Sequence, residues 1–210
     1  VLQNPTCLGG NEGRATASGS SSNGGNVSYL WSNGQTIQTI TGLTAGVYAV
    51  VVTDTTNCQA TASVTVTDGI DITASAVVNN VSCFGLVDGD LQVTSSPAGV
   101  IYEWDNQFVA TNGNLTDLAA GEYTVTISIA QGCRQDFTFT VTEPQSITLA
   151  TAQTRAITCY DGNNGAANVS VTGGSPAYSY LWSNGVQTDA IDSIPAGGYS
   201  VVVTDANGCT

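Results

Sequence analysis

Cysteine is the residue type in this chain with the most evident chemistry. Six cysteines occur in 210 residues, together with no histidine and no methionine. None forms the close Cys-x-x-Cys or Cys/His pairs that are typical of zinc sites. Even, widely spaced cysteines in a chain rich in small polar residues instead predict disulfide bonds formed in an oxidising compartment. The six are Cys7, Cys58, Cys83, Cys133, Cys159 and Cys209.

The other reactive residue types give little support for catalysis. Without histidine or lysine, general acid–base chemistry would depend on carboxylates or tyrosines. The carboxylates are scattered singly, and nothing in the sequence places the two facing carboxylates that glycoside hydrolysis needs. We therefore expect no catalytic residue, no cofactor and no enzymatic activity.

Two acidic turns raise the question of calcium. Asp88-Gly-Asp90 and Asp161-Gly-Asn-Asn164-Gly gather the oxygen ligands that Ca²⁺ prefers. However, the EF-hand spacing is absent, and Asp-Gly pairs are ordinary turn residues. We favour the turn interpretation and expect no metal site.

The charge balance excludes two classes of partner. Sixteen acidic residues face three basic ones, Arg14, Arg134 and Arg155, which gives a net charge of −13. Nucleic-acid binding needs clustered basic residues, and so does binding to an anionic membrane surface. No apolar stretch of about 18 residues occurs, so we expect no membrane insertion. The acidity fits a soluble, self-repelling surface protein.

An internal repeat of about 76 residues positions the cysteines. The first cysteine of each repeat recurs at intervals of 76 residues, the second at 75 and 76, and a tryptophan at 73 and 78. Such a period indicates tandem structural units. The predicted units are 1–68, 69–144 and 145–210. The first strand of the first unit is expected to be incomplete. The last strand of the third is expected to be missing, because the chain is a segment of a longer one, or to be donated by another subunit.

Each unit contains short β-branched or alternating segments typical of strands. Gln131-Gly132 and Asn207-Gly208 fit tight hairpin turns, and no window has the period of an amphipathic helix. The pattern predicts an all-β fold, a tandem array of three immunoglobulin-like β-sandwich repeats. The clearest strand segments are 62–66, 123–129, 137–141 and 199–203.

The repeated aromatic residues fit a sandwich core. A single tryptophan per unit is expected between the sheets, and the Leu-x-x-Gly-x-Tyr segment resembles a tyrosine corner. Three matched aromatics could also form a platform that stacks on sugars, but we favour the core interpretation. The residues are Trp31, Trp104, Trp182, Tyr48, Tyr123 and Tyr199.

Two disulfide pairings are open. The default joins the cysteines within each unit, so that Cys7 would pair with Cys58, and each loop of about 50 residues would stabilise a small domain by about 4 kcal/mol. Yet the two cysteines of one immunoglobulin-like unit lie near opposite poles of the sandwich. The alternative joins neighbouring units, Cys7 to Cys133 and Cys83 to Cys209, and leaves Cys58 and Cys159 over. Because of those two leftover cysteines, we favour the pairing within units.

The repeated motifs resemble the SprB repeat. The third unit matches best, with Cys159, Gly173-Gly174-Ser-Pro176-Ala-Tyr178, Trp182-Ser-Asn-Gly185, Gly197-Gly-Tyr199 and Val203-Thr-Asp205-Ala-Asn-Gly208-Cys209. The middle unit departs most, but the resemblance extends over essentially the whole chain. It implies a large surface protein of Bacteroidetes, related to a gliding-motility adhesin, exported by the type IX system and displayed as a filament. It implies no ligand.

Two patterns could mark glycosylation. Four Asn-x-Ser/Thr triplets, at Asn26, Asn80, Asn114 and Asn168, are explained by composition alone. The resemblance makes a bacterial O-glycosylation pattern more relevant, an aspartate followed by Ser or Thr and then a hydrophobic residue or Thr. Thr55 and Ser193 fit this pattern and are the expected sites of a glycoprotein.

These expectations converge on an extracellular cell-surface protein. The favoured function is a structural or adhesive repeat segment of a bacterial filament or stalk, and the alternative is a carbohydrate-binding accessory module of a larger secreted protein. Expected partners are neighbouring repeats of the same long chain or identical subunits in a filament, with surface glycans as a further candidate.

Overall fold

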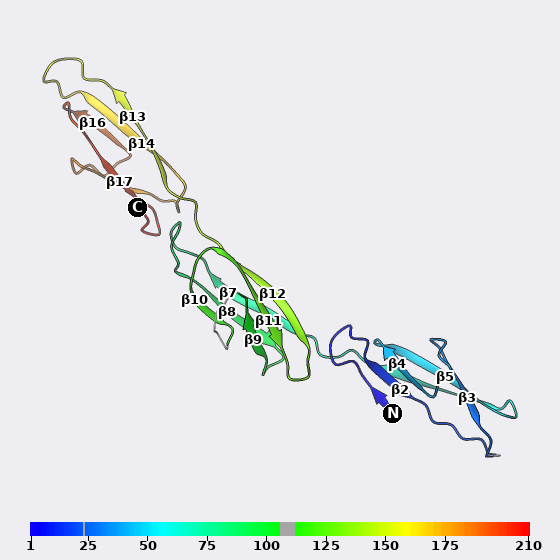
Figure 1. The fold of residues 1–210 in the computed structure, drawn as a ribbon. Coiled ribbons are helices and arrows are strands. Elements are labelled where there is room, and N and C mark those ends of the chain that lie inside the picture. Colours follow the sequence, from blue (N-terminus) through cyan, green and yellow to red (C-terminus); the bar gives the residue numbers. More distant parts are fainter. Residues whose placement is uncertain (23, 106–111) are drawn as a thin grey trace. The chain divides into compact units, whose positions relative to one another are not determined.

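A computed structural model describes residues 1–22, 24–105 and 112–210, and those residues form strands, turns and loops without a helix (Figure 1). The described part of the chain has 17 strands in six small sheets. The all-β class predicted from the sequence is confirmed. Among the described residues, no helix is long and apolar enough to cross a membrane.

The first group of strands forms two three-stranded sheets. One has the order β1-β2-β4 and the other the order β3-β5-β6, and the neighbouring strands are antiparallel. This is the strand order of an immunoglobulin-like sandwich, in which the third, fifth and sixth strands face the first, second and fourth. The bounds are β1 (Leu2–Gln3), β2 (Gly13–Thr16), β3 (Val27–Trp31), β4 (Thr39–Leu43), β5 (Gly46–Asp54) and β6 (Gln59–Val66).

The middle group repeats the same order. Its sheets are β7-β8-β10 and β9-β11-β12. The predicted hairpin at Gln131-Gly132 joins β11 to β12, and Gly132 has φ +97°, a conformation that favours glycine. The bounds are β7 (Thr73–Asn79), β8 (Gly89–Ser96), β9 (Ile101–Trp104), β10 (Asn114–Leu118), β11 (Gly121–Ser128) and β12 (Arg134–Val141).

The last group follows the order again, with one three-stranded and one two-stranded sheet. The sheets are β13-β14-β16 and β15-β17. The predicted strand at 199–203 is observed from Val201, and the turn at Asn207-Gly208 follows it. The bounds are β13 (Thr148–Arg155), β14 (Gly165–Thr172), β15 (Ser179–Trp182), β16 (Ala190–Ile194) and β17 (Val201–Thr204).

By compactness the chain divides into two units. Unit 1 comprises Val1–Ser75, Thr94–Trp104 and Val125–Phe137, and unit 2 comprises Ala76–Val93, Asp105–Thr124 and Thr138–Thr210. Both units therefore take part of the middle strand group. The boundaries at 68/69 and 144/145 stay a prediction.

Each unit has its own apolar core. In unit 1, Ala15, Ile40 and Leu43 from one sheet pack with Trp31, Val50 and Val66 from the other. In unit 2, a second cluster combines Val169 and Ile191 with Trp182 and Val203. Both clusters join residues of two sheets, as a sandwich core requires.

The repeated aromatics lie where a sandwich core would need them. Trp31, Trp104 and Trp182 are 4%, 8% and 3% exposed. The indole nitrogen of Trp31 donates to the carbonyl of Ile37, and that of Trp182 to the carbonyl of Thr188, so that these polar groups are satisfied inside.

The three repeated tyrosines are half-buried and form the corner contact that their motif resembles. Each hydroxyl donates to the backbone carbonyl four residues earlier, at 3.0 Å for Tyr48, 2.8 Å for Tyr123 and 3.2 Å for Tyr199. The bond fixes the turn that enters the next strand.

Candidate functional site: the disulfide-bonded junctions

The disulfides join different strand groups rather than the two cysteines of one group. Cys7 bonds Cys133 and Cys83 bonds Cys209, with Cα atoms 5.4 and 5.7 Å apart and the same sequence separation of 126 residues. Each bond lies within one compact unit. The default pairing of Cys7–Cys58, Cys83–Cys133 and Cys159–Cys209 is therefore wrong, and the alternative between neighbouring repeats is the one observed.

Strand register explains why the pairing within a group fails. Cys7 precedes β2, whose first residue Gly13 pairs with Leu43, next to the start of β5. Cys58 lies in the hairpin at the far end of β5, where Thr53 pairs with Gln59. About eight residues of extended strand, some 25 Å, separate these two ends, and a disulfide needs Cα atoms within about 7 Å.

At the first junction, which Cys7–Cys133 closes, the loop that contains Cys7 is hydrogen-bonded to the segment leading from β6 to β7. Ile70 donates to the carbonyl of Thr6 at 2.8 Å and accepts from the amide of Leu8 at 2.9 Å, and Cys7 and Ile70 form a parallel bridge. The side chain of Asn4 accepts from the amide of Thr67 at 3.1 Å. The disulfide thus closes a junction that backbone bonds already define.

The second junction, closed by Cys83–Cys209, repeats the asparagine contact of the first about 76 residues later. The side chain of Asn80 accepts from the amide of Thr142 at 2.9 Å, as Asn4 does from Thr67. In addition, the side-chain amide of Asn207, next to Cys209, donates to the carbonyl of Ser82, next to Cys83, at 2.8 Å.

An acidic residue after each of the first two strand groups accepts a hydrogen bond from the loop that contains the first cysteine. The amide of Gly9 donates to Asp68 at 3.2 Å, and that of Gly85 donates to Glu143 at 2.6 Å. Both loops make this contact, at sequence separations of 59 and 58 residues, so this part of the junction is repeated in the chain.

The loop around each first cysteine is held by a side chain five residues later. The amides of Thr6, Ser82 and Thr158 donate to side-chain oxygens of Glu12, Asp88 and Asn164, at 2.6, 3.0 and 3.3 Å. The amide of Thr6 lowers the pKa of Glu12, and the hydroxyl of Ser82 lowers the pKa of Asp88, because both bonds favour the ionised form.

These contacts give the acidic turns a structural role. Asp88 and Asn164, weighed above as calcium ligands, accept hydrogen bonds from the amides of Ser82 and Thr158 in the cysteine loops. No cluster of three or more His, Cys, Asp or Glu side chains suited to a metal occurs among residues 1–22, 24–105 and 112–210.

The hairpin before each second cysteine also has one repeated geometry. The backbone amides of Asp54, Ile129 and Asp205 donate to the carbonyl of the cysteine four residues later, each at 3.0 Å. Asp54 and Asp205 additionally accept from the amides of Cys58 and Cys209 at 2.9 Å.

These bonds lower the pKa of both carboxyl groups. For Asp54 the main cause is the hydroxyl of Thr56, followed by the amide of Cys58. For Asp205, which is buried, it is the amide of Ser175. The ionised carboxylates therefore hold the hairpins in shape.

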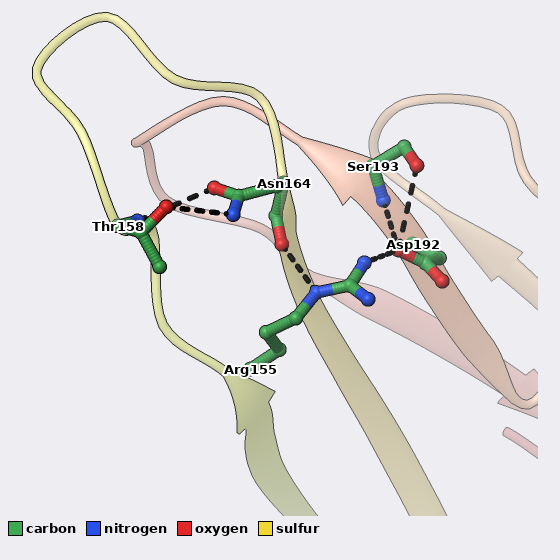
Figure 2. A network of polar contacts seen from close by, with 5 residues as sticks. All are labelled: Arg155, Thr158, Asn164, Asp192 and Ser193. Atoms are coloured by element: carbon green, nitrogen blue, oxygen red, sulfur yellow. Dashed lines mark hydrogen bonds and ion pairs between the residues drawn. The ribbon is translucent and has the colours of Figure 1, made fainter.

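Cys58 and Cys159 are unpaired and exposed in the described chain. Figure 2 shows the polar network that holds the loop containing Cys159. Arg155 forms an ion pair with Asp192 and donates from Nε to the carbonyl of Asn164, whose side-chain nitrogen donates to the hydroxyl of Thr158 at 3.0 Å. The loop is thus shaped without a disulfide.

The two candidate glycosylation residues lie on the surface. Thr55 and Ser193 are both exposed. Ser193 is part of the network in Figure 2, because its amide donates to Asp192 at 2.5 Å. Their occupancy stays a prediction.

Sequence reasoning missed the residues that build the junctions around the disulfides. Asn4 and Asn80 recur at 76 residues, and the acidic pair Asp68 and Glu143 recurs at 75. The period that identified the cysteines would also have identified these positions, but single polar residues in turns carry no signal unless the copies are aligned.

The sheets and junctions define the class of this protein: an all-β chain of immunoglobulin-like strand groups joined by disulfides. The family model of the SprB repeat matches this chain at residues 1–36 and 151–187. The two segments make up about a third of the chain, so the expected likeness over its whole length is not reproduced. The match is consistent with a SprB-type repeat protein.

Several solved structures resemble the chain, and all are distant. Sidekick-1 immunoglobulin domains 1–5 align at 15% identity and a TM-score of 0.35, over 99% of this chain and 55% of that one, so the chain spans just over half of that structure. Extracellular domains 3–5 of Drosophila OTK align at 11% identity and a TM-score of 0.33, over 99% of this chain and 93% of that one. Murine CEACAM1b aligns at 19% identity and a TM-score of 0.28, over 65% of this chain and 86% of that one. No curated protein sequence matches the chain.

Proposed function

We propose that this chain is a structural and adhesive repeat segment of a secreted bacterial cell-surface filament or stalk protein, without catalytic activity. The observation that carries the proposal is the covalent closure of both junctions, Cys7–Cys133 and Cys83–Cys209. Disulfides persist outside the cytoplasm, and linking successive strand groups limits their separation under load. The SprB-type matches support the surface location.

Neighbouring repeats, or identical subunits, are the partners that this role requires. The chain-entropy model assigns a loop of 126 residues about 5 kcal/mol of stabilisation. A bond between strand groups uses that stabilisation to hold two groups together, whereas a bond within one group would stabilise that group alone. This difference favours a load-bearing role for the array.

A carbohydrate-binding module has weaker support. Such a module would need aromatic residues exposed on one face, but the three tryptophans that recur with the repeat are buried. Surface glycans stay a candidate partner of the adhesive role.

Labelling of the producing cells tests the location. An antibody against the purified chain is expected to bind intact cells, and protease added outside is expected to remove the signal. Labelling that requires cell lysis would contradict the proposal. The intact mass of the native chain, compared with the mass of the bare sequence, tests the glycosylation of Thr55 and Ser193.

A further inference from the structure

The two unpaired cysteines belong to the two halves of the observed junction. Cys58 occupies the hairpin position of Cys133 and Cys209, and Cys159 occupies the loop position of Cys7 and Cys83. The chain thus has one hairpin cysteine and one loop cysteine that are not in a disulfide.

The hairpin that contains Cys58 already has the geometry of the bonded hairpins. The residue before each cysteine is left-handed, with φ of +65° at Asn57, +97° at Gly132 and +86° at Gly208. The amide of that residue donates to the carbonyl three residues earlier at 3.0, 3.0 and 3.1 Å. The backbone around the free thiol is therefore built as in the two bonded copies.

The loop that contains Cys159 has the geometry of the bonded loops. Each first cysteine accepts, through its carbonyl, the amide of the residue three positions later, at 3.0 Å for Cys7, 3.1 Å for Cys83 and 3.0 Å for Cys159. The residue two positions after the cysteine is left-handed in all three loops, including Asp161, which is not a glycine. Asp161 thus holds this turn despite its side chain.

The surfaces beside the free thiols provide a second observation. In unit 2, Phe84 lines a cleft of about 440 Å³ together with Asp205 and Cys209. Tyr160, the equivalent of Phe84, is 97% exposed. The loop of the free Cys159 thus presents an uncovered aromatic side chain at the position where Phe84 lines the cleft of the closed junction.

The complementary surface lies beside Cys58. A cleft of about 390 Å³ is lined by Ser20, Ser21, Asp54 and Cys58. Asp54 and Cys58 correspond to Asp205 and Cys209, which line the cleft of the second junction together with Phe84. The chain therefore presents both a loop with an exposed aromatic residue and a cleft that shares this aspartate and cysteine with the cleft that Phe84 lines.

We propose that Cys159 of one copy forms a disulfide with Cys58 of a second copy, so that copies join head to tail through a junction like Cys83–Cys209. Ala156 replaces the asparagine of the other two junctions, but that asparagine binds the segment between strand groups of one chain, which a junction between copies lacks. The inference deepens the proposed function and relies on it only for an oxidising compartment.

The bond needs a two-electron oxidant, which a low-molecular-weight disulfide such as oxidised glutathione supplies. The thiolate of Cys159 attacks one sulfur of glutathione disulfide and releases one glutathione as its thiolate. The thiolate of Cys58 from the second copy then attacks the protein sulfur of the mixed disulfide and releases the second glutathione. Both cysteines are oxidised, one glutathione disulfide is reduced to two thiols, and the two cysteine protons end on those thiols.

A mixing experiment with purified full chains tests the proposal. With oxidised glutathione, the wild-type chain is expected to give a ladder of covalent oligomers on a non-reducing gel. Cys58→Ser and Cys159→Ser should each stay monomeric, and their mixture should give a single dimer. Peptide mapping of that dimer should identify only the bond between Cys159 and Cys58.

Three outcomes would overturn the proposal: a mixture that stays monomeric, single variants that dimerise as readily as the mixture, or a bond between Cys58 and Cys159 of one chain. Adding Tyr160→Ser to the Cys58→Ser variant is expected to slow dimer formation several-fold. Ile37→Ser, which removes an exposed apolar side chain that lines neither cleft, should leave the rate unchanged. Because the oxidant is supplied, failure here would leave the surface-labelling test of the proposed function unaffected.

Discussion

The hydroxyl of Tyr48 forms one hydrogen bond across the corner, to the carbonyl of Thr44. Tyr48→Phe leaves the ring and removes only that bond, so we expect the free energy of unfolding to fall by about 1 kcal/mol. Urea denaturation monitored by tryptophan fluorescence measures the change. Tyr160→Phe is the matched control, because Tyr160 is almost fully exposed and its hydroxyl should contribute nothing. Equal effects of the two substitutions would contradict the corner role.

The carboxylate of Asp205 makes the second junction sensitive to acid. Its pKa lies below the ordinary value of 3.8, chiefly because the amide of Ser175 donates to it. A carboxyl group with a lowered pKa in the folded state stabilises that state above its ordinary pKa, and the stabilisation is lost as the pH falls through the lowered value. Stability should therefore be constant near neutral pH and decline below about pH 4.

Asp205→Asn tests this dependence. The variant is expected to be less stable than the wild type at pH 6. The difference should shrink at pH 3, because below the ordinary pKa of 3.8 the carboxyl group of the unfolded chain is protonated and proton uptake favours unfolding of the wild type. Thermal unfolding at the two pH values measures it. Asp71→Asn, at an exposed carboxylate outside the hairpins, provides the comparison. A difference for Asp205→Asn that is equal at pH 6 and pH 3 would rule out the role of its charge.

At the scale of elements, the first junction depends on a close approach of two backbone segments. A Cβ added to Gly69 would lie 2.2 Å from the carbonyl carbon of Thr6 and 2.3 Å from its oxygen. Gly69→Ala should therefore push apart the segments around Cys7 and Ile70. Overpacking of this kind costs about 1–3 kcal/mol. We expect dithiothreitol to reduce Cys7–Cys133 about tenfold faster, measured by mass spectrometry of alkylated peptides.

Two comparisons isolate this effect. The reduction rate of Cys83–Cys209 in the same Gly69→Ala molecule should be unchanged, because that bond belongs to the other compact unit. Gly198→Ala should change neither rate, since its added Cβ meets no atom within 4 Å. A uniform acceleration of both bonds would indicate general destabilisation instead.

The strands were predictable from the sequence because their signals are local. Alternating β-branched residues and Gly-containing turns predicted β6, β11, β12 and β17 to within a few residues. The Leu-x-x-Gly-x-Tyr motif likewise predicted a contact only four residues long. Such features depend on neighbours in sequence, which a single chain displays directly.

The disulfide pairing could not be decided from the sequence, because it depends on which ends of the strand groups lie next to each other. The two cysteines of a repeat are about 50 residues apart, and the bonded ones are 126 apart, so cysteine count and spacing fit both pairings. The expected position of the two cysteines at opposite ends of one sandwich favoured the correct pairing. We nevertheless favoured the pairing within units, because the alternative leaves Cys58 and Cys159 without partners. Those leftovers are better understood as halves of further junctions than as evidence against the bond between repeats.

At the scale of the whole molecule, the two bonds overlap between residues 83 and 133, which has a mechanical consequence. When both are intact, the shortest covalent path from Val1 to Thr210 follows the chain to Cys7, crosses to Cys133, returns to Cys83 and crosses to Cys209. This path contains roughly 60 residues, and at about 3.5 Å per residue it cannot exceed about 200 Å. Fully reduced, the same chain could extend to about 700 Å.

Pulling single molecules by their ends measures this limit, and paired substitutions test the pairing behind it. The double substitution Cys7→Ser and Cys133→Ser removes one disulfide. The shortest covalent path then follows the chain from Val1 to Cys83, crosses the remaining disulfide to Cys209 and ends at Thr210. The expected maximum extension is about 290 Å. The substitutions Cys83→Ser and Cys209→Ser should give the same value, since the remaining path is equally long. If the cysteines instead paired within each repeat, the first double variant would retain only Cys159–Cys209 and extend to about 550 Å, a difference that force spectroscopy resolves easily.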